Sequence, residues 1–277
     1  MIGLLLITAS TFFQEIGASI GKKEVEDHKE SIYTMGFLSL AVGTLFFLLI
    51  VFLKNEFIFS LASLPTLGVR IVLEIAQAHM TMLAIAYADR STTGFLRIGT
   101  IPLLLATDIF LGYTINFAQI IGISLIAVAL IFLLINHGIR KKGIGYIIFT
   151  TINAVITLSL FKYNITNFNS VEAEQSIVMS VLIIYFLIMA FFIAKENPIK
   201  FLKKPIFIGQ SFSEGIGAVL GSFAYLFAPA SIITTAKRSL SVLWSIVAGK
   251  VYFHEKHLII KLMAFTLIIG GLVLLVV

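Results

Sequence analysis

Long apolar stretches recur along the whole chain and are separated by short polar connections. Each stretch is close to the ~20 residues that a helix needs to cross the hydrocarbon core of a bilayer. These stretches do not alternate between apolar and polar positions, as the shorter strands of a membrane barrel do. The pattern predicts ten membrane-spanning helices, at residues 3–21, 32–53, 66–88, 92–111, 115–136, 143–162, 174–194, 206–227, 231–249 and 258–277.

Composition supports the same class. Of the 277 residues, 59% are hydrophobic and 12% are charged, whereas a soluble domain has about 25% charged residues. We therefore expect an all-α polytopic protein, integral to the lipid bilayer of a bacterial or archaeal inner membrane. The net charge of +6 does not indicate nucleic-acid binding, because most Lys and Arg residues lie in the short connections. The absence of cysteine excludes disulfides, thiol catalysis and cysteine-ligated metals.

The second half of the chain repeats features of the first. The segment Ser91–Tyr113 aligns with Ser231–Glu255, since both begin with Ser or Thr and have a cation about two turns later. The other aligned positions are Ser19 with Ser159, Lys22 with Lys162, and Ala86-Tyr87 with Ala224-Tyr225. An odd number of crossings reverses the second copy, so the pattern predicts two inverted five-helix repeats, residues 1–140 and 141–277. Inverted repeats are typical of secondary transporters, whose substrate lies near the membrane midplane.

The end of the second repeat has the most specific pattern. After an aromatic-rich segment, "VLWSIVAGKVYF", come Glu255-Lys256 and a last helix with Gly270-Gly271. This pattern, together with the repeat, resembles the drug/metabolite transporter superfamily and its ten-helix EamA-type members. The first repeat departs from it, with Tyr113 in place of the acidic residue. The resemblance implies a cofactor-free exporter or exchanger, monomeric or homodimeric. It also implies a central cavity lined by the first, third, fourth, sixth, eighth and ninth spans.

Orientation is predicted from the loop charges. Connections after odd-numbered spans hold most of the cations, and those after even-numbered spans hold only Lys54 and Lys162. The positive-inside rule then places the odd connections in the cytoplasm and both termini outside. The family resemblance implies the reverse, with the termini inside. We follow the charge count.

Several ionisable residues fall inside the predicted spans, where each costs about 2.5–3.5 kcal/mol at the membrane centre. They are Glu15, Arg70, Glu74, His79, Arg97, Asp108, Glu214, Lys237 and Arg238. Arg70 and Glu74 are four residues apart and are expected to form a structural pair. Asp108 lies near a span end and is expected to be solvated. No second ligand stands beside His79 at metal-binding spacing, so no metal site is predicted.

The predicted substrate contacts are Lys237, Arg238, Arg97, Glu214 and His79. Lys237 and Arg238 point about 100° apart on a helix, so at least one is expected to face protein, although snorkelling to the membrane surface is the alternative. The pair resembles the ninth-helix Lys-Arg of triose-phosphate and nucleotide-sugar transporters, which implies contact with an anionic group. Arg97 lies at a comparable depth in the fourth span. A cavity of mixed charge suits a zwitterion such as an amino acid, or an organic anion.

Glu15 is the predicted proton-coupling residue, because removal from water favours the protonated form of a carboxyl group. The run Glu15, Gly17, Ala18, Ser19, Lys22 resembles the first helix of small multidrug resistance proteins, with a spacing one residue shorter. A structural hydrogen bond to another helix is the alternative. Two GxxxG motifs, Gly17/Gly21 and Gly217/Gly221, predict close helix packing.

Other function classes have less support in the sequence. It contains no HExxH motif and no Gly-x-Ser-x-Gly elbow, so no enzyme activity and no catalytic residue is predicted. No ATP-binding loop is present, so transport is expected to use a proton or substrate gradient. Proton-coupled efflux of drugs or lipophilic cations, a channel, and a non-transporting scaffold remain the alternatives.

Overall fold

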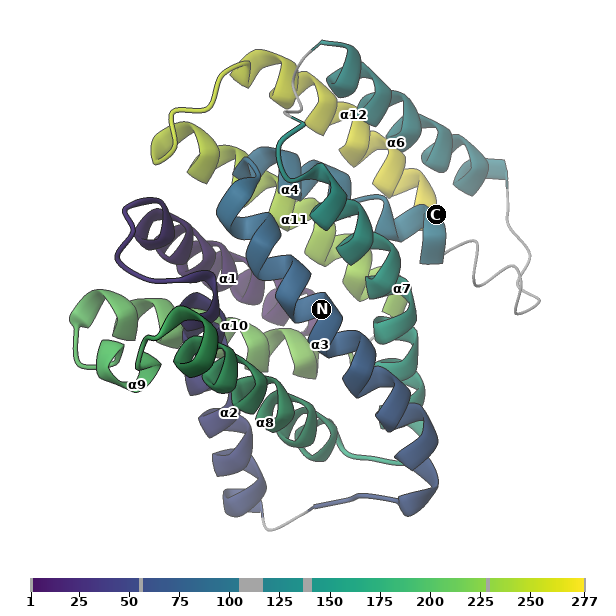
Figure 1. Ribbon diagram of the computed structural model, residues 1–277. Coiled ribbons are helices and arrows are strands. Elements are labelled where there is room, and N and C mark those ends of the chain that lie inside the picture. The colour runs from purple at the N-terminus through teal and green to yellow at the C-terminus, as the bar shows by residue number, and fades with distance from the viewer. Residues whose placement is uncertain (1, 55–56, 105–116, 137–140, 228–229, 277) are drawn as a thin grey trace.

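The computed structural model describes residues 2–54, 57–104, 117–136, 141–227 and 230–276, and this part of the chain contains helices and no strand (Figure 1). The long helices are α1 (Ile2–Glu26), α2 (Ile32–Lys54), α3 (Leu64–Tyr87), α6 (Phe117–Ile135), α7 (Ile144–Asn167), α8 (Val171–Met189), α10 (Pro205–Ala224), α11 (Ala230–Val251) and α12 (Leu258–Val276). The short ones are η1 (Leu61–Ser63), α4 (Arg90–Arg97), η2 (Ala190–Ala194) and α9 (Pro198–Phe201).

Each predicted span overlaps a helix of the structure. The fourth predicted span, 92–111, contains an irregularity that the sequence pattern did not predict. Its helix α4 ends at Arg97, a turn follows at Ile98 and Gly99, and helical backbone resumes at 100–104. The rest of this span, including Asp108, lies outside the described residues.

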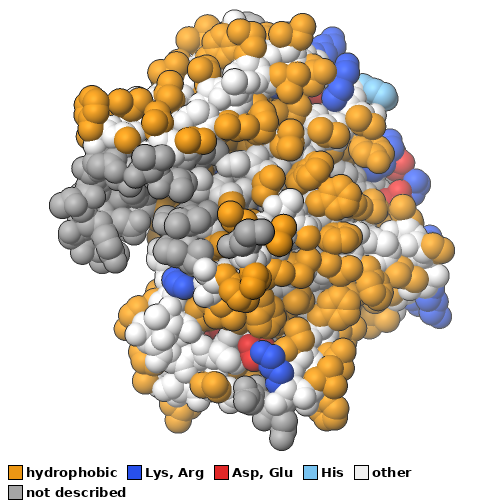
Figure 2. Space-filling view, turned by 180° about the vertical axis from the view of Figure 1, so that it is seen from behind, with side chains coloured by type: hydrophobic (Ala, Val, Ile, Leu, Met, Phe, Trp, Pro, Cys, Tyr) orange, Lys and Arg blue, Asp and Glu red, His pale blue; other side chains and the backbone are white. Residues whose placement is uncertain are grey.

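The outer surface is that of a membrane-embedded protein. Five helices of the described chain are long and apolar enough to cross a membrane, at Ile2–Glu26, Ile32–Lys54, Leu61–Tyr87, Ile144–Asn167 and Val171–Ala194. Large apolar side chains are exposed over much of the surface, with Phe52 80% and Phe117 76% accessible. Figure 2 shows these side chains spread over one face, with most of the visible charges towards one edge. Such an extensive apolar surface is suited to lipid rather than water.

Most close helix packing joins the two halves of the chain. In the described residues, α1 packs on α10 and α11, α2 packs on α8 and α10, and α3 packs on α7. Other close pairs between the halves are α4 with α11, α4 with α7, α3 with α8, and α6 with α12, and within a half α11 packs on α12 and α2 on α3. Figure 1 shows α6 and α12 side by side at one edge of the bundle. The other helices surround the space between α1, α3 and α11.

Glycines bring α1 and α10 into close contact, which confirms the packing predicted from the two GxxxG motifs. A Cβ atom on Gly217 would lie 2.5 Å from Cγ of Gln14 and 2.9 Å from the carbonyl oxygen of Ser10. A Cβ atom on Gly17 would lie 2.5 Å from Cγ of Glu214. The hydroxyl of Ser10 donates to the carbonyl of Gly217 at 2.6 Å. The two helices are therefore close enough for a serine side chain of α1 to bond the backbone of α10.

Two lysines bind the ends of neighbouring helices in an equivalent way. Nζ of Lys22, on α1, donates to the carbonyl of Ala88 just after α3, at 2.5 Å. Nζ of Lys162, on α7, donates to the carbonyl of Tyr225 just after α10, at 3.0 Å. Cations stabilise the negative end of a helix dipole and satisfy carbonyls that have no partner within the helix. The two lysines aligned in the sequence thus have the same structural role.

Glu255 binds the first residues of α4. One carboxylate oxygen accepts from the backbone N–H of Arg90 at 2.7 Å, and the other accepts from Ser91 and from Nζ of Lys261. Burial opposes the charged form of Glu255, but the hydrogen bonds from Lys261 and Ser91 outweigh it and lower the pKa of this carboxyl. A carboxylate at a helix N-terminus is also favoured by the helix dipole. The acidic residue of the family-like pattern therefore has a structural role in this chain.

Glu30, in the connection between α1 and α2, is an unusual buried acid. Only 4% of it is accessible, and neither carboxylate oxygen has a hydrogen-bond partner among the described residues. Burial raises its pKa to about 9, against a small opposing contribution from the amide of Gln210, and the nearby charges of Glu24 and Glu196 raise it further. Glu30 is therefore protonated in the folded protein at neutral pH.

This shift predicts how stability depends on pH. The folded state holds a proton that the unfolded chain releases, so stability is expected to fall as pH rises from about 4.5 towards about 9. Glu30→Gln is expected to reduce this loss of stability with pH and to raise the melting temperature at alkaline pH. The rise is about 2–4 °C for each kcal/mol that the substitution adds to the free energy of unfolding. The measurement is a series of melts in detergent across this pH range.

The control for this experiment is Glu196→Gln. The Glu196 carboxylate accepts from the backbone and hydroxyl of Ser31 and from the hydroxyl of Thr34. Its replacement is expected to lower the melting temperature. Because the Glu196 charge contributes to raising the pKa of Glu30, the decline that Glu30 causes is expected to end at a somewhat lower pH but to persist. Parallel pH curves for the wild type and Glu30→Gln would contradict the prediction.

Candidate functional site

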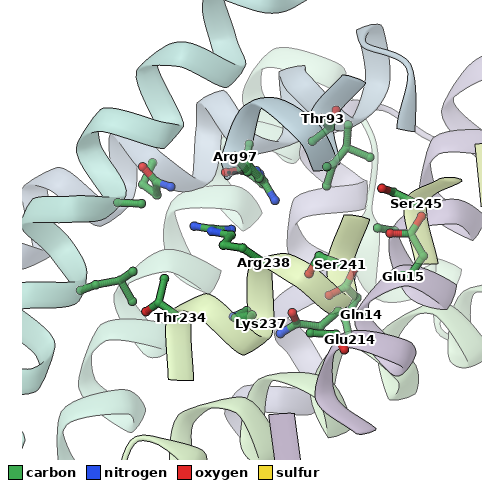
Figure 3. A pocket seen from close by; sticks show the side chains of 18 of the residues that line it. Gln14, Glu15, Thr93, Arg97, Glu214, Thr234, Lys237, Arg238, Ser241 and Ser245 are labelled. Carbon is green, nitrogen blue, oxygen red and sulfur yellow. Dashed lines mark hydrogen bonds between the residues drawn. The ribbon is translucent and has the colours of Figure 1, made fainter. Parts of the chain in front are cut away.

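A cavity of about 320 Å³ lies between six helices, α1, α3, α4, α7, α10 and α11 (Figure 3). These helices correspond to the first, third, fourth, sixth, eighth and ninth predicted spans, as expected from the family resemblance. The lining is mostly polar and charged, and three of the helices come from each half of the chain. Volumes above about 300 Å³ are typical of small-molecule sites.

Three predicted cations line this cavity. Arg97 comes from α4, and Lys237 and Arg238 come from α11; Figure 3 shows Arg97 and Arg238 pointing into the same space. Nη2 of Arg97 donates to the hydroxyl of Thr81 at 3.4 Å. Nε of Arg238 is buried without a hydrogen-bond partner in the described chain. None of the ion pairs formed by the described residues includes any of the three cations.

Glu15 lines the cavity too, and its partner is Arg90. Nε and Nη2 of Arg90 donate to the two carboxylate oxygens of Glu15, each at 2.9 Å, and the hydroxyl of Ser19 donates to one of them at 3.2 Å. This parallel two-bond geometry is the strong form of an arginine–carboxylate pair. Lys237 and Arg238 line the same cavity, but the ion pair of Glu15 is with Arg90.

Sequence reasoning missed Arg90 as a cavity residue and counted it among the loop cations. Only Ala88 and Asp89 separate α3 from α4, so the chain turns without reaching solvent. Arg90 becomes the first residue of α4 and is 5% accessible. The short connection between the third and fourth predicted spans was the signal that could have identified Arg90. A cation beside a two-residue turn cannot lie in a polar loop, because the turn is too short to form one.

Arg70 and Glu74 form the expected pair, with Nε and Oε1 3.6 Å apart. A second carboxylate is closer: Nη1 of Arg70 lies 2.7 Å from Oε1 of Glu174. Glu174 is fully buried and also accepts from Asn164 and Asn169. The guanidinium of Arg70 also lies over the ring of Phe161, 4.6 Å from its centre. Arg70 therefore belongs to a structural network that joins α3 to α7 and α8.

The last two predicted site residues have different surroundings. Glu214 lines the cavity from α10 and forms neither an ion pair nor a hydrogen bond among the described residues. His79 is not part of the cavity lining. Its Nδ1 lies 2.6 Å from the hydroxyl of Tyr185 on α8. No group of three or more acidic or histidine residues in the described chain is arranged to hold a metal ion.

Two pairs of charged cavity residues have the spacing of the predicted repeat. Glu74 and Glu214 are separated by the same number of residues as Arg97 and Lys237, and as the helix-capping pair Lys22 and Lys162. The first two pairs line the cavity from equivalent helices of the two halves. The environment of each acid differs, since Glu74 has Arg70 beside it and Glu214 has no equivalent partner.

Comparison with known proteins does not assign the chain to a family. No protein-family model matches it, and no curated protein matches it. The resemblance to drug/metabolite transporters therefore rests on the sequence pattern alone and stays a prediction.

Proposed function

We propose that this chain is a secondary transporter that moves a small anionic or zwitterionic metabolite by alternating access. In this proposal, ten helices form two inverted five-helix repeats of the drug/metabolite transporter type. The observation that carries the proposal is the polar cavity between the two halves, with three cations that have no carboxylate partner in the described chain. A membrane-buried charge of this kind is expensive and marks a substrate or ion pathway.

The helix packing supports the repeat. Exchanging each helix with its counterpart (α1 with α7, α2 with α8, α3 with α10, α4 with α11, α6 with α12) turns the close pairs between the two halves into one another. The α1–α10 pair becomes α7–α3, α1–α11 becomes α7–α4, and α2–α10 becomes α8–α3, all of which pack closely. The pairs α2–α8, α4–α11 and α6–α12 map onto themselves. This is the pattern expected of two copies related by a two-fold axis.

The charges of the cavity support the substrate class. Among the described residues, no carboxylate lies within ion-pair distance of Arg97, Lys237 or Arg238, whereas the acids Glu15 and Glu74 each have an arginine. Arginine and lysine bind carboxylate and phosphate groups. Glu214 remains as a single acid that can accept from the ammonium group of a zwitterion. A lipophilic cation would be repelled by the three cations.

The test is counterflow with the purified full-length chain in liposomes. The compounds are amino acids, dicarboxylates and phosphate esters, with tetraphenylphosphonium as a lipophilic cation, and protein-free liposomes are the control. Liposomes preloaded with one of the anions or zwitterions are expected to accumulate its labelled form. Uptake of tetraphenylphosphonium alone would overturn the substrate class. Counterflow of none of the compounds would overturn transport itself.

A further inference from the structure

Glu214 differs from the other cavity carboxylates in having no partner. Glu15 is bound by Arg90 and Ser19, and Glu74 is paired with Arg70. Glu214 forms no hydrogen bond and no ion pair in the described part of the chain. The side chain of Glu214 passes over Gly17 of α1. A Cβ atom on Gly17 would lie 3.1 Å from Cδ of Glu214. The absence of a side chain at Gly17 thus leaves the carboxylate facing the cavity.

The charged groups around Glu214 come from several helices. Glu15 of α1, Arg90 and Arg97 of α4, and Lys237 of α11 act on it across the cavity. Helix α2 meets α10 at Gly43 and Gly215 and brings no charge there. On α8, the acids Glu172 and Glu174 are paired with Lys54 and Arg70. Two of the cations that act on Glu214, Arg97 and Lys237, are therefore ones that the substrate is proposed to bind, whereas Arg90 is held by Glu15.

We propose that Glu214 is the carboxylate of this cavity that takes up and releases a proton. An ionised carboxylate withdrawn from water costs several kcal/mol unless cations offset it. When an anionic substrate binds Lys237 and Arg97, the part of the offset that these two cations supply is lost. A hydronium ion in the cavity then gives its proton to a Glu214 oxygen, leaving a neutral carboxylic acid and a water molecule. When the substrate leaves, the cations again stabilise the ionised carboxylate, and Glu214 releases its proton to water.

The coupling that follows rests on the proposed transport function. One proton and one substrate cross together in the same direction, so movement of a singly charged anion is electroneutral. The sequence placed this role on Glu15. The bidentate pair with Arg90 instead suits Glu15 to hold α1 against the start of α4, because both of its oxygens already have a donor.

The first test needs no substrate. Infrared difference spectra are recorded in lipid nanodiscs between alkaline and neutral buffer, on the full-length protein carrying Glu30→Gln, because Glu30 titrates over the same range. They are expected to show a protonated carboxyl band. Glu214→Gln is expected to remove it, and Glu214→Asp to keep it at a shifted frequency. Glu74→Gln is the matched control, because Glu74 has the equivalent place in the other half, and it is expected to keep the band. A band that persists in Glu214→Gln, or that disappears in Glu15→Gln instead, would overturn the proposal.

The second test measures coupling, with L-glutamate, succinate and phosphate as probes in liposomes. In the wild type, an inward proton gradient is expected to drive accumulation of a probe. Glu214→Gln is expected to reduce accumulation to the level without a gradient while counterflow continues. Glu74→Gln is expected to keep the gradient-driven accumulation. Gradient-driven accumulation that persists in Glu214→Gln would overturn the proposal. Absence of counterflow in the wild type would instead overturn the transport function, and the infrared result would not be affected.

Discussion

Replacing Arg238 with glutamine is expected to weaken the binding of an anionic substrate by about 30-fold or more. Removing one partner of a buried charge pair costs about 2 kcal/mol or more, and each 1.4 kcal/mol corresponds to about a factor of ten. Among the three cations of the cavity that have no carboxylate partner in the described chain, Arg238 has a buried Nε without a hydrogen-bond partner, so it has a donor to offer to a substrate. Titration calorimetry with the compound identified by counterflow measures the loss.

The melting temperature separates a binding role from a structural one. Arg97, Lys237 and Arg238 repel one another without a carboxylate partner, so removing one charge is expected to keep or raise the melting temperature. Lys204→Gln is the control, because Lys204 is an exposed lysine beside Phe201 and Phe207. It is expected to change neither the substrate affinity nor the melting temperature. Unchanged affinity in Arg238→Gln, or a loss of affinity that follows a loss of stability, would contradict the assignment.

Gly217→Leu is expected to destabilise the protein by at least about 3 kcal/mol and to prevent normal packing of α1. The first atom of the new side chain would meet Cγ of Gln14 at 2.5 Å and the Ser10 carbonyl at 2.9 Å, and backbone atoms cannot move aside cheaply. The fluorescence of Trp244, the single tryptophan of the chain, reports this region because its ring lies 5.2 Å from that of Phe12 on α1. Thermal unfolding followed at Trp244 is the measurement.

Gly209→Leu is the matched control on the same helix. A Cβ atom at Gly209 meets nothing within 4 Å, so the substitution is expected to change stability by less than about 0.5 kcal/mol. Similar losses in the two variants would show that α10 tolerates no side chain at either glycine, for a reason other than contact with α1. Full stability of Gly217→Leu would contradict the packing described above.

The helices could be predicted from the sequence because their apolar runs are long and leave few other structures possible in lipid. The cavity helices followed from the repeat, and Glu15, Arg97, Glu214, Lys237 and Arg238 all line the cavity. A buried charge in an apolar run is a strong signal, because it has to face protein or water. The break at Ile98 and Gly99 in the fourth span had its signal in Pro102, which lacks the N–H that would bond the carbonyl of Ile98 in a regular helix. The predicted span did not take this proline into account.

The partners of these residues could not be predicted in the same way. Arg90 meets Glu15, and Glu174 meets Arg70, across large distances in the sequence. Such pairings depend on the rotation of each helix about its axis, which a nearly uniform apolar run does not specify. The same uncertainty placed His79 in the site, although its helix turns it towards Tyr185 instead.

The packing of α1 on α10 also sets an order of events during synthesis. Helix α1 enters the membrane first, but the glycine-lined surface that it packs against is inserted only after most of the chain has been made. During that interval α1 carries Glu15 without its final neighbours. Arg90 is inserted much earlier than α10 and is able to neutralise Glu15 in the meantime. The Glu15–Arg90 pair thus keeps the charge of Glu15 neutralised in the membrane until α10 is inserted and packs against α1.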